Sequence, residues 1–512
     1  LVADEEKAAL IASRRELPRA VRIRNGQGGI YRTNLLEKIL CLLGCKLAAI
    51  SPSGAGVEME AGRPGWHDSI NGIPSLFGAS SSECFQLLRA IGTVRDSLES
   101  LGLDEYFTQP VPREVADLLG GLSELLGEYL QSEADDRDYV YWDRANDLKE
   151  DYRERIRFGF DGETVSLALR EILRLLDLAE RRIRASLPKA TDPDTNLPAT
   201  YITHQADAWE QLTTPDGQLR RHRRGYPLVR VTKFRMHRYP LFLEAPMHAM
   251  RTETDPERGR QRWQAVRESP LFDRQLGMYM LADSVDDESP ETGRIHAWPA
   301  GWFENENIFM HMEHKYLLAT LQAGLYDEFF RDFAHCLPCY QDPRIYARSP
   351  LENTSFIVSS RHPRPEWHGR GCLPRTSGTT AEVLHMLLVM SFGPRPFRWE
   401  SGELSLKLEP VLPAWLFTEE QQTDTVTRLD GSADSYVFPD CSYSALLLGR
   451  TMVSYVNPSL KDTFGPDAVS AQRYRLIYDD GRELDVEGPA LAGEHARDVR
   501  DRKVRRILVD LA

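Results

Sequence analysis

Residues 163–185 read ETVSLALREILRLLDLAERRIRA, with leucine and isoleucine recurring every three or four positions. This spacing places the apolar side chains on one face of a helix and the charged side chains on the other. The segment therefore predicts a strongly amphipathic helix that packs against neighbouring helices. The same spacing recurs in five other stretches, at 35–50, 82–100, 112–132, 311–325 and 377–392. We therefore expect a mainly helical domain up to about residue 400.

Past residue 400 the pattern changes to short apolar stretches separated by Gly, Pro and Asp. These stretches predict the strands of a β-rich C-terminal domain, at 404–408, 444–448, 451–456, 474–478 and 505–509. We expect two domains, 1–400 and 401–512, because 512 residues exceed one ordinary hydrophobic core.

The composition excludes several classes of partner. A net charge of −14 argues against a nucleic-acid partner, and the basic run RRHRR at 220–224 is typical of a solvated loop. No stretch of about 18 apolar residues predicts a membrane span. Seven irregularly placed cysteines are typical of a reducing compartment, so we expect a cytoplasmic location. Cys336 and Cys339 form one CxxC without a second pair at zinc spacing, which predicts no metal site.

The segment 61–83, AGRPGWHDSINGIPSLFGASSSE, places Asp68 beside Trp66 and before an Asn-Gly turn. A carboxyl beside aromatic surface loses water, which favours its protonated form near neutral pH. A general acid for glycosidic cleavage has this property, so Asp68 is a candidate proton donor. The alternative is a turn or cap residue, the more frequent role of an Asp in this context.

The segment 302–318, WFENENIFMHMEHKYLL, is an acidic, amide-rich loop that leads into a helix opening near His311. His311 and Lys315 are four residues apart and share a helix face. The histidine pair of an HExxH metal site is absent. We therefore expect this segment to bind an anion or a sugar rather than a metal.

The segment 362–382, HPRPEWHGRGCLPRTSGTTAE, places Ser377-Gly378-Thr379-Thr380 before a helix that begins near Thr380. Free backbone N–H groups at a helix N-terminus form an anion site, to which Arg370 and Arg375 can add charge-assisted bonds. A simple helix cap is an equally good interpretation of this segment alone.

In this order, the three segments resemble the inverting phosphorylases of glycoside hydrolase family 94. The Trp-x-Asp-x-x-Asn motif that carries the general acid in that family is matched by WHDSIN at 66–71. The Glu-Asn-Gly-Gly-Ile-Phe-x-His motif that supplies a phosphate-binding His is similar to ENENIFMH at 304–311, where Glu306 and Asn307 replace the glycines. The Thr-Gly pair that completes the family's phosphate site corresponds to Ser377-Gly378.

The chain is most similar to the 1,2-β-oligoglucan (sophoro-oligosaccharide) phosphorylases of that family, through the stretches 26–38, 56–80, 352–363 and 407–417. The resemblance implies an α/α six-hairpin toroid followed by a small antiparallel β-sandwich. It also implies reversible, inverting phosphorolysis of a β-1,2-linked gluco-oligosaccharide, with α-D-glucose 1-phosphate as product. Inorganic phosphate is then a substrate, and no metal or other cofactor is expected.

The resemblance assigns a role to each candidate residue. Asp68 is the implied general acid. The implied phosphate ligands are His311, Ser377, Gly378 and Thr379. The implied substrate-binding residues are Trp66, His67, Asn71, Glu304, Asn305 and Arg370.

The chain departs from the family at its start. Only 67 residues precede Asp68, whereas family members have a β-sandwich, a helical linker and the opening toroid helices there. The chain therefore resembles the C-terminal part of such an enzyme, and we expect a separate N-terminal chain or fragment, or a homo-oligomer. Two alternatives stay open. One is an inverting hydrolase or glycosyltransferase with Glu304, Glu306 or Glu60 as base, and the other is a glycan-binding fragment without catalysis.

Overall fold

Helices make up about 39% of the chain and strands about 23%. The computed structural model describes residues 3–60, 65–222, 224–374, 378–400, 402–427 and 431–512. The chain divides into two compact units: unit 1 comprises Leu1–Tyr316 and His335–Arg375, and unit 2 comprises Leu317–Ala334 and Thr376–Ala512. Several small antiparallel sheets accompany the helices in both units.

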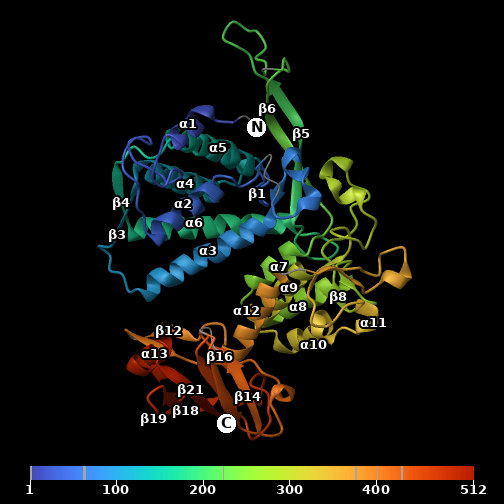
Figure 1. Cartoon of the computed structure of the whole chain (residues 1–512). Helices are drawn as coiled ribbons and strands as arrows, with labels where there is room; N and C mark the ends of the chain where they lie inside the picture. Colours follow the sequence, from blue (N-terminus) through green and yellow to red (C-terminus); the bar gives the residue numbers. More distant parts are fainter. Residues whose placement is uncertain (1–2, 61–64, 223, 375–377, 401, 428–430) are drawn as a thin grey trace. The chain divides into compact units, whose positions relative to one another are not determined.

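Five long helices form the first part of unit 1 (Figure 1). They are α2 (Leu35–Leu47), α3 (Ser81–Ser100), α4 (Arg113–Gln131), α5 (Arg137–Arg155) and α6 (Leu169–Ser186). Shorter helices are α1 (Glu5–Ala12), α7 (Glu244–Arg251), α8 (Pro256–Glu268) and α11 (Pro343–Tyr346). The helices α9 (Met310–Gln322) and α10 (Tyr326–Cys336) each cross a unit boundary. The predicted helices near 35, 82, 112 and 311 are confirmed.

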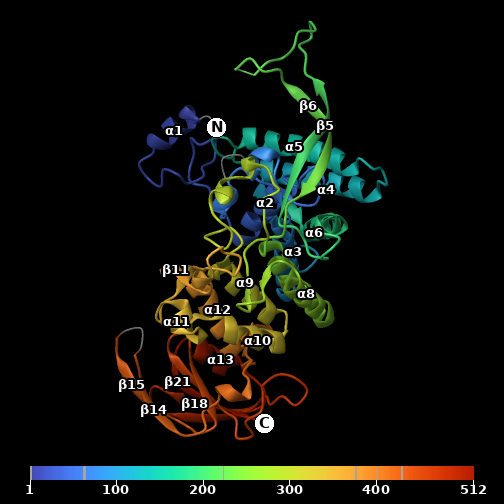
Figure 2. The same cartoon turned by 90° about the vertical axis from the view of Figure 1, so that its right-hand side faces the viewer.

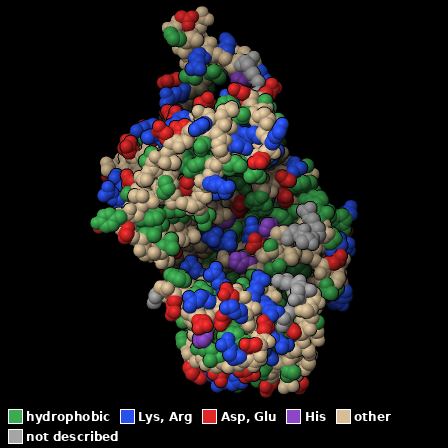
Figure 3. Space-filling model, turned by 60° about the vertical axis from the view of Figure 1, so that its left-hand side comes forward, with side chains coloured by type: hydrophobic (Ala, Val, Ile, Leu, Met, Phe, Trp, Pro, Cys, Tyr) green, Lys and Arg blue, Asp and Glu red, His purple; other side chains and the backbone are tan. Residues whose placement is uncertain are grey.

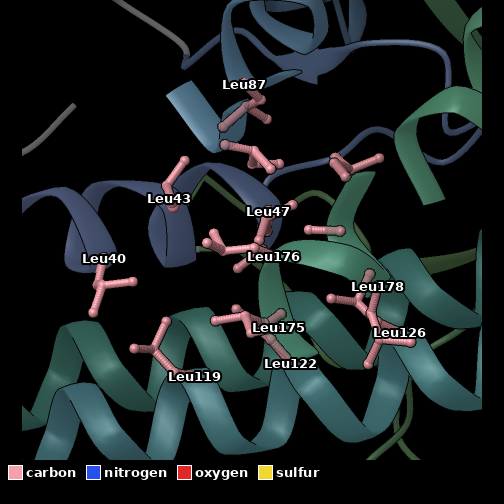
Figure 4. Close-up of a cluster of buried hydrophobic side chains, with 14 of the residues drawn as sticks. Leu40, Leu43, Leu47, Leu87, Leu119, Leu122, Leu126, Leu175, Leu176 and Leu178 are labelled. Atoms are coloured by element: carbon pink, nitrogen blue, oxygen red, sulfur yellow. The ribbon is translucent and has the colours of Figure 1, made fainter. Parts of the chain in front are cut away.

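Leucine supplies many of the buried side chains in the core of these helices (Figure 4), and Tyr141, Ala145 and Tyr152 are the buried contribution of α5. Leu40 of α2, Leu122 and Leu126 of α4, and Leu176 of α6 are at most 1% exposed. Burying each such side chain contributes about 1.5–3 kcal/mol relative to leaving it in water. The prediction that the leucines of 163–185 pack against neighbouring helices is therefore confirmed, because they form one side of this core.

The start of that helix differs from the prediction. Thr164–Ala168 forms strand β4, which pairs antiparallel with β3 (Thr108–Pro112), and α6 begins only at Leu169. The first residues, TVSLA, alternate in character and include two β-branched side chains, a pattern that suits a strand. The Glu171 carboxylate accepts a hydrogen bond from the Ala168 N–H at 2.7 Å and fixes the helix start.

A four-stranded antiparallel sheet in the order β1-β2-β5-β6 was not predicted. Its short strands are β1 (Val57–Glu58) and β2 (Ala79–Ser80), and its long strands are β5 (Tyr201–Gln211) and β6 (Val229–Arg238). Residues 201–204 are buried at the base of the sheet. Strand β6 contacts α5, where the Tyr139 hydroxyl donates to the Val231 carbonyl oxygen and the Trp142 ring packs on Phe234, and the tip of the hairpin projects beyond the helices of unit 1 (Figure 2). The prediction of a mainly helical first domain is wrong for this segment.

Two smaller sheets of unit 1 lie near the candidate site. Strands β9 (Ile308–Phe309), β10 (Thr354–Ile357) and β11 (Gly371–Pro374) pair in the order β11-β10-β9. Strands β7 (Phe272–Asp273) and β8 (Met278–Tyr279) form a short hairpin. The pairing of Phe309 with Phe356 fixes the segment that leads into α9.

Unit 2 carries most of the C-terminal strands. Its five-stranded sheet has the order β16 (Ser442–Leu447), β17 (Thr451–Val456), β21 (Val504–Leu511), β18 (Ala471–Tyr478) and β19 (Glu483–Glu487). The remaining strands are β12 (Phe397–Glu400), β13 (Glu403–Leu406), β20 (Leu491–Ala492), β14 (Gln422–Thr427) and β15 (Ala433–Phe438), and the helices are α12 (Gly378–Phe392) and α13 (Gly493–Arg500). The predicted β-rich character past residue 400 is confirmed, although β17 and β21 run parallel rather than antiparallel.

The leucine core generates a stability prediction. Leu122→Ala removes a side chain that is 0% exposed and leaves a cavity between α4 and its neighbours. We expect the free energy of unfolding to fall by about 2–5 kcal/mol, measured by urea titration with circular dichroism. Leu101→Ala, at a position 68% exposed, is the matched control and should change it by less than about 0.5 kcal/mol. Equal effects at both positions would contradict this description of the core.

Candidate active site

Asp68 opens a short 3-10 helix, Asp68–Ile70, and its carboxylate faces solvent. The side chain is 67% exposed, and Arg294 Nη2 lies 3.2 Å from Asp68 Oδ2. Arg294 Nε also donates to the Asp68 carbonyl oxygen at 3.0 Å. The prediction that Asp68 is shielded from water is therefore wrong. The neighbouring Trp66 ring stacks on His67 instead of covering Asp68, with ring centroids 4.4 Å apart.

The loop that carries Asp68 packs closely against backbone near residue 293. The Gly72 N–H donates to the Thr292 carbonyl oxygen at 2.9 Å. Gly293 has φ of 137°, and a Cβ there would lie 2.6 Å from Asn71 Oδ1 and 2.7 Å from the Ser69 carbonyl oxygen. Only glycine fits this close approach without strain. The Asn71 side chain is exposed beside this contact.

Trp66 is held by a carboxylate that the sequence did not single out. Trp66 Nε1 donates to Glu244 Oε1 at 2.8 Å, and the Tyr201 hydroxyl donates to Glu244 Oε2 at 3.2 Å. Burial raises the pKa of Glu244 despite the opposing effects of these bonds and of nearby Lys315. The signal in the sequence is a lone acid within the apolar stretch LFLEAPM at 241–247.

His67 is a buried, neutral residue of the site. Its side chain is 2% exposed, with Nδ1 3.4 Å from the Tyr201 hydroxyl and Nε2 4.0 Å from Glu304 Oε2. The Phe242 ring packs edge-on against it at 5.4 Å. Burial lowers the pKa of His67 to about 3, so the imidazole carries no charge near neutral pH.

The loop 304–307 lies against the Asp68 segment. Glu304 Oε2 accepts a hydrogen bond from the Ser69 N–H at 3.0 Å. Burial raises the pKa of Glu304, and the nearby Asp68 charge adds to this shift. Asn305 Nδ2 donates to the Trp298 carbonyl oxygen at 2.8 Å, which ties the loop to its own start.

The end of this loop combines strain with an unsatisfied amide. Glu306 has φ of 48°, in the left-handed region that favours glycine. The Asn307 side chain is 1% exposed, and neither of its polar atoms has a hydrogen-bond partner among the described residues. Backbone strain of this kind persists where the surrounding structure enforces it, as it often does at functional sites.

Helix α9 begins at Met310, so His311 lies in its first turn and Lys315 one turn later. The Phe309 ring is 6.1 Å from His311 and 5.8 Å from Trp66 between ring centroids. Lys315 Nζ lies 5.8 Å from the centroid of the Trp66 ring. Lys315 is thus placed beside the aromatic residue Trp66, and His311 lies beside Phe309, which stacks on Trp66.

The remaining predicted residues are not part of this cluster. Arg370 is exposed, and its carbonyl oxygen accepts a bond from the Val358 N–H at 3.0 Å. Glu60, one of the predicted bases, forms an exposed ion pair with Arg153 at 2.9 Å. Glu306 is 3.8 Å from Arg361.

The predicted phosphate loop belongs partly to unit 2. Gly378 is the first residue of α12, and Thr379 is buried behind it. Arg375 and Ser377 lie outside the described residues. The meeting of this loop with His311 stays a prediction.

Other features give no sign of a metal or a membrane. Within the described ranges, no group of three or more His, Cys, Asp or Glu side chains is arranged to hold a metal ion. Cys336 is buried and Cys339 is exposed. None of the helices in the described part of the chain is long and apolar enough to cross a membrane.

Comparison with known proteins gives no relative: no family model matches the chain, and no curated protein matches its sequence.

The burial of His67 predicts a pH dependence of stability. Burial lowers the pKa of His67 from 6.5 to about 3. Between pH 6.5 and 3, this histidine is therefore protonated in the unfolded chain and neutral in the folded chain. Stability should therefore fall as the pH drops from 6.5 towards 3, by at most about 1.4 kcal/mol per pH unit. His67→Gln should remove this contribution, measured as a shallower pH dependence of urea unfolding. Gln at the exposed His222 serves as control, and an unchanged slope in His67→Gln would contradict the assignment.

Proposed function

We propose that this chain carries the proton donor of an inverting glycoside phosphorylase that acts on β-1,2-linked gluco-oligosaccharides. The observation that carries the proposal is the convergence of two distant segments, 66–71 and 304–311, through the bond from the Ser69 N–H to Glu304. These are the two segments that resemble the acid and histidine motifs of glycoside hydrolase family 94. Their contact supports a common role for them.

The chemistry requires one proton donor and one bound anion. Asp68 would give its proton to the bridging oxygen as the bond from that oxygen to the anomeric carbon breaks. Phosphate would form the new bond from the opposite face, which turns a β-glucoside into α-glucose 1-phosphate. Because phosphate is itself the nucleophile, the protein needs no second carboxylate to activate water.

Because Asp68 is exposed, this mechanism requires that water be excluded from its carboxyl when substrate binds. A carboxyl that is 67% exposed and paired with Arg294 is poorly shielded from water. The bound oligosaccharide would therefore have to exclude water and displace Arg294 from the carboxyl. Trp66, which is 41% exposed beside Asp68, offers an apolar face on which a sugar ring can stack.

The loop 304–307 supports the resemblance in a second way. Glu306 stands where the family motif has its first glycine, and it adopts the positive φ that glycine tolerates best. A glycine at this position would accept the same backbone conformation. We further propose that the helices of unit 1 belong to an α/α toroid, and that the protein acts in the cytoplasm.

An inverting hydrolase is the second candidate, and one observation favours it. Burial raises the pKa of both Glu244 and Glu304, and both carboxyls border the segment that carries Asp68. A second carboxylate near the acid is what a hydrolase needs to activate water. Phosphate dependence separates the two activities.

Asp68→Asn tests the role of the acid. A neutral amide cannot donate the proton, so turnover of β-1,2-gluco-oligosaccharides should fall by about 10²–10⁴-fold. A nitrophenyl β-glucoside needs little protonation of its leaving group and should be cleaved with a much smaller loss. Asp147→Asn, at an exposed carboxyl on α5, is the matched control and should retain full activity. Equal losses on both substrates would mean that Asp68 acts through structure.

His311→Ala tests the role of the anion site. Removing the imidazole should raise the phosphate concentration needed for half-maximal rate at least about tenfold, with little change in the KM for oligosaccharide. The assay measures α-glucose 1-phosphate released at varied phosphate. Degradation of the glucan at the same rate without phosphate would instead establish the hydrolase.

A further inference from the structure

Residues 205–238 of the β5–β6 hairpin form an arm that takes no part in the proposed function; its lower part contacts α5 through Val231 and Phe234, and its tip is formed by residues 212–228. Among its described residues none is buried, and it projects from unit 1 with Lys and Arg side chains exposed along it (Figure 3). Its sequence has eight Lys or Arg against three Asp or Glu, a charge of +5. The chain as a whole carries −14, so the remainder carries −19. Such a separation of charge favours contact between the arm and an acidic surface.

The tip of the arm is ordered by its own backbone. The Arg220 N–H donates to the Leu212 carbonyl oxygen, and the Leu228 N–H donates to the Arg220 carbonyl oxygen, both at 2.8 Å. The side chains of Arg220 and Arg224 are exposed and form no ion pair with any residue the structure describes. Preordered backbone lowers the entropy lost on binding.

Aromatic side chains accompany these charges. Trp209 is 57% exposed and Tyr226 is 70% exposed. Exposed Trp, Tyr and Arg together are typical of the energetically important part of a protein–protein interface. A loop that only contacts solvent usually lacks such exposed aromatic side chains.

An acidic loop lies at the base of the arm. The loop 283–291, DSVDDESPE, has five acids and no Lys or Arg. Asp286, Asp287 and Glu291 are exposed and have no ion pair within the described residues, whereas Val285 is 1% exposed and anchors the loop. Glu288 accepts a hydrogen bond from His237 at 2.9 Å, which places the loop beside the start of the arm.

The tip of the arm, residues 212–228, cannot reach this loop within its own chain, although His237 at the base of the arm contacts it. Strands of ten or eleven residues extend about 33 Å, and the tip lies at the far end from His237. A second copy related by a twofold axis can bring each tip to the other copy's loop, which gives two identical contacts. We propose that the arm binds the acidic loop 283–291 of a second copy of this chain. The inference is independent of the proposed catalytic function.

The test is self-association of the full chain, measured by sedimentation equilibrium. The wild type should dimerise at low ionic strength and dissociate as salt shortens the screening length from about 8 Å at 0.15 M to 3 Å at 1 M. Arg220→Glu with Arg221→Glu should weaken the dimer at least about tenfold, because like charges then face each other. Adding Asp286→Lys and Asp287→Lys to the same chain should restore it.

A control separates this contact from a general charge effect. Arg170→Glu with Arg174→Glu makes the same charge change at exposed positions on α6 and should leave the dimer intact. Replacing residues 212–228 by a two-residue Asn-Gly turn should abolish the dimer, with unit 1 still folded by circular dichroism. The proposal is overturned by a wild type that stays monomeric at low salt, or by a dimer that survives the arm variants. Binding of the arm to heparin without self-association would also overturn it.

Discussion

The candidate site depends on how the Asp68 loop is held, because that loop has no long helix or strand of its own. Its backbone is fixed from two sides: the Gly72 N–H donates to the Thr292 carbonyl oxygen, and the Ser69 N–H donates to the half-buried Glu304 carboxylate. Gly293 allows the two chain segments to approach so closely that a Cβ would clash. A catalytic carboxyl has to be positioned within a fraction of an ångström, and backbone contacts of this kind provide that precision.

The sequence predicted the helices better than the strands, for a physical reason. The leucine spacing of α4 and α6 marks one buried face, and the structure buries Leu122 and Leu176 there. The side chains of VRVTKFRMHR that face unit 1, such as Phe234 and Met236, are only half-buried, so the alternation of this strand carries a weak signal. The strand β4 was missed because its residues run directly into a stronger helical pattern.

The sequence identified candidate residues of the site, but it did not predict how buried each of them is. Trp66, His67, Asp68 and Glu304 lie together in the structure, and the roles that the motif resemblance gives them stay predictions. The burial of each was not readable, because it depends on side chains from distant segments. His67 is buried by Tyr201 and Phe242 while its neighbour Asp68 is exposed, and no local pattern distinguishes them. Glu244 was missed for the same reason, since its partner Trp66 is far away in the chain.

The charges of the cluster set a condition for binding phosphate. Three carboxyls, Asp68, Glu244 and Glu304, face two cations, Arg294 and Lys315, and His67 is neutral. The raised pKa values of Glu244 and Glu304 reduce the negative charge that an incoming dianion would meet. In the proposed mechanism, the incoming phosphate would still add negative charge beside the Asp68 region. Lys315 lies near the Trp66 ring, and free N–H groups at a helix start, such as that of α9, would supply further positive potential there.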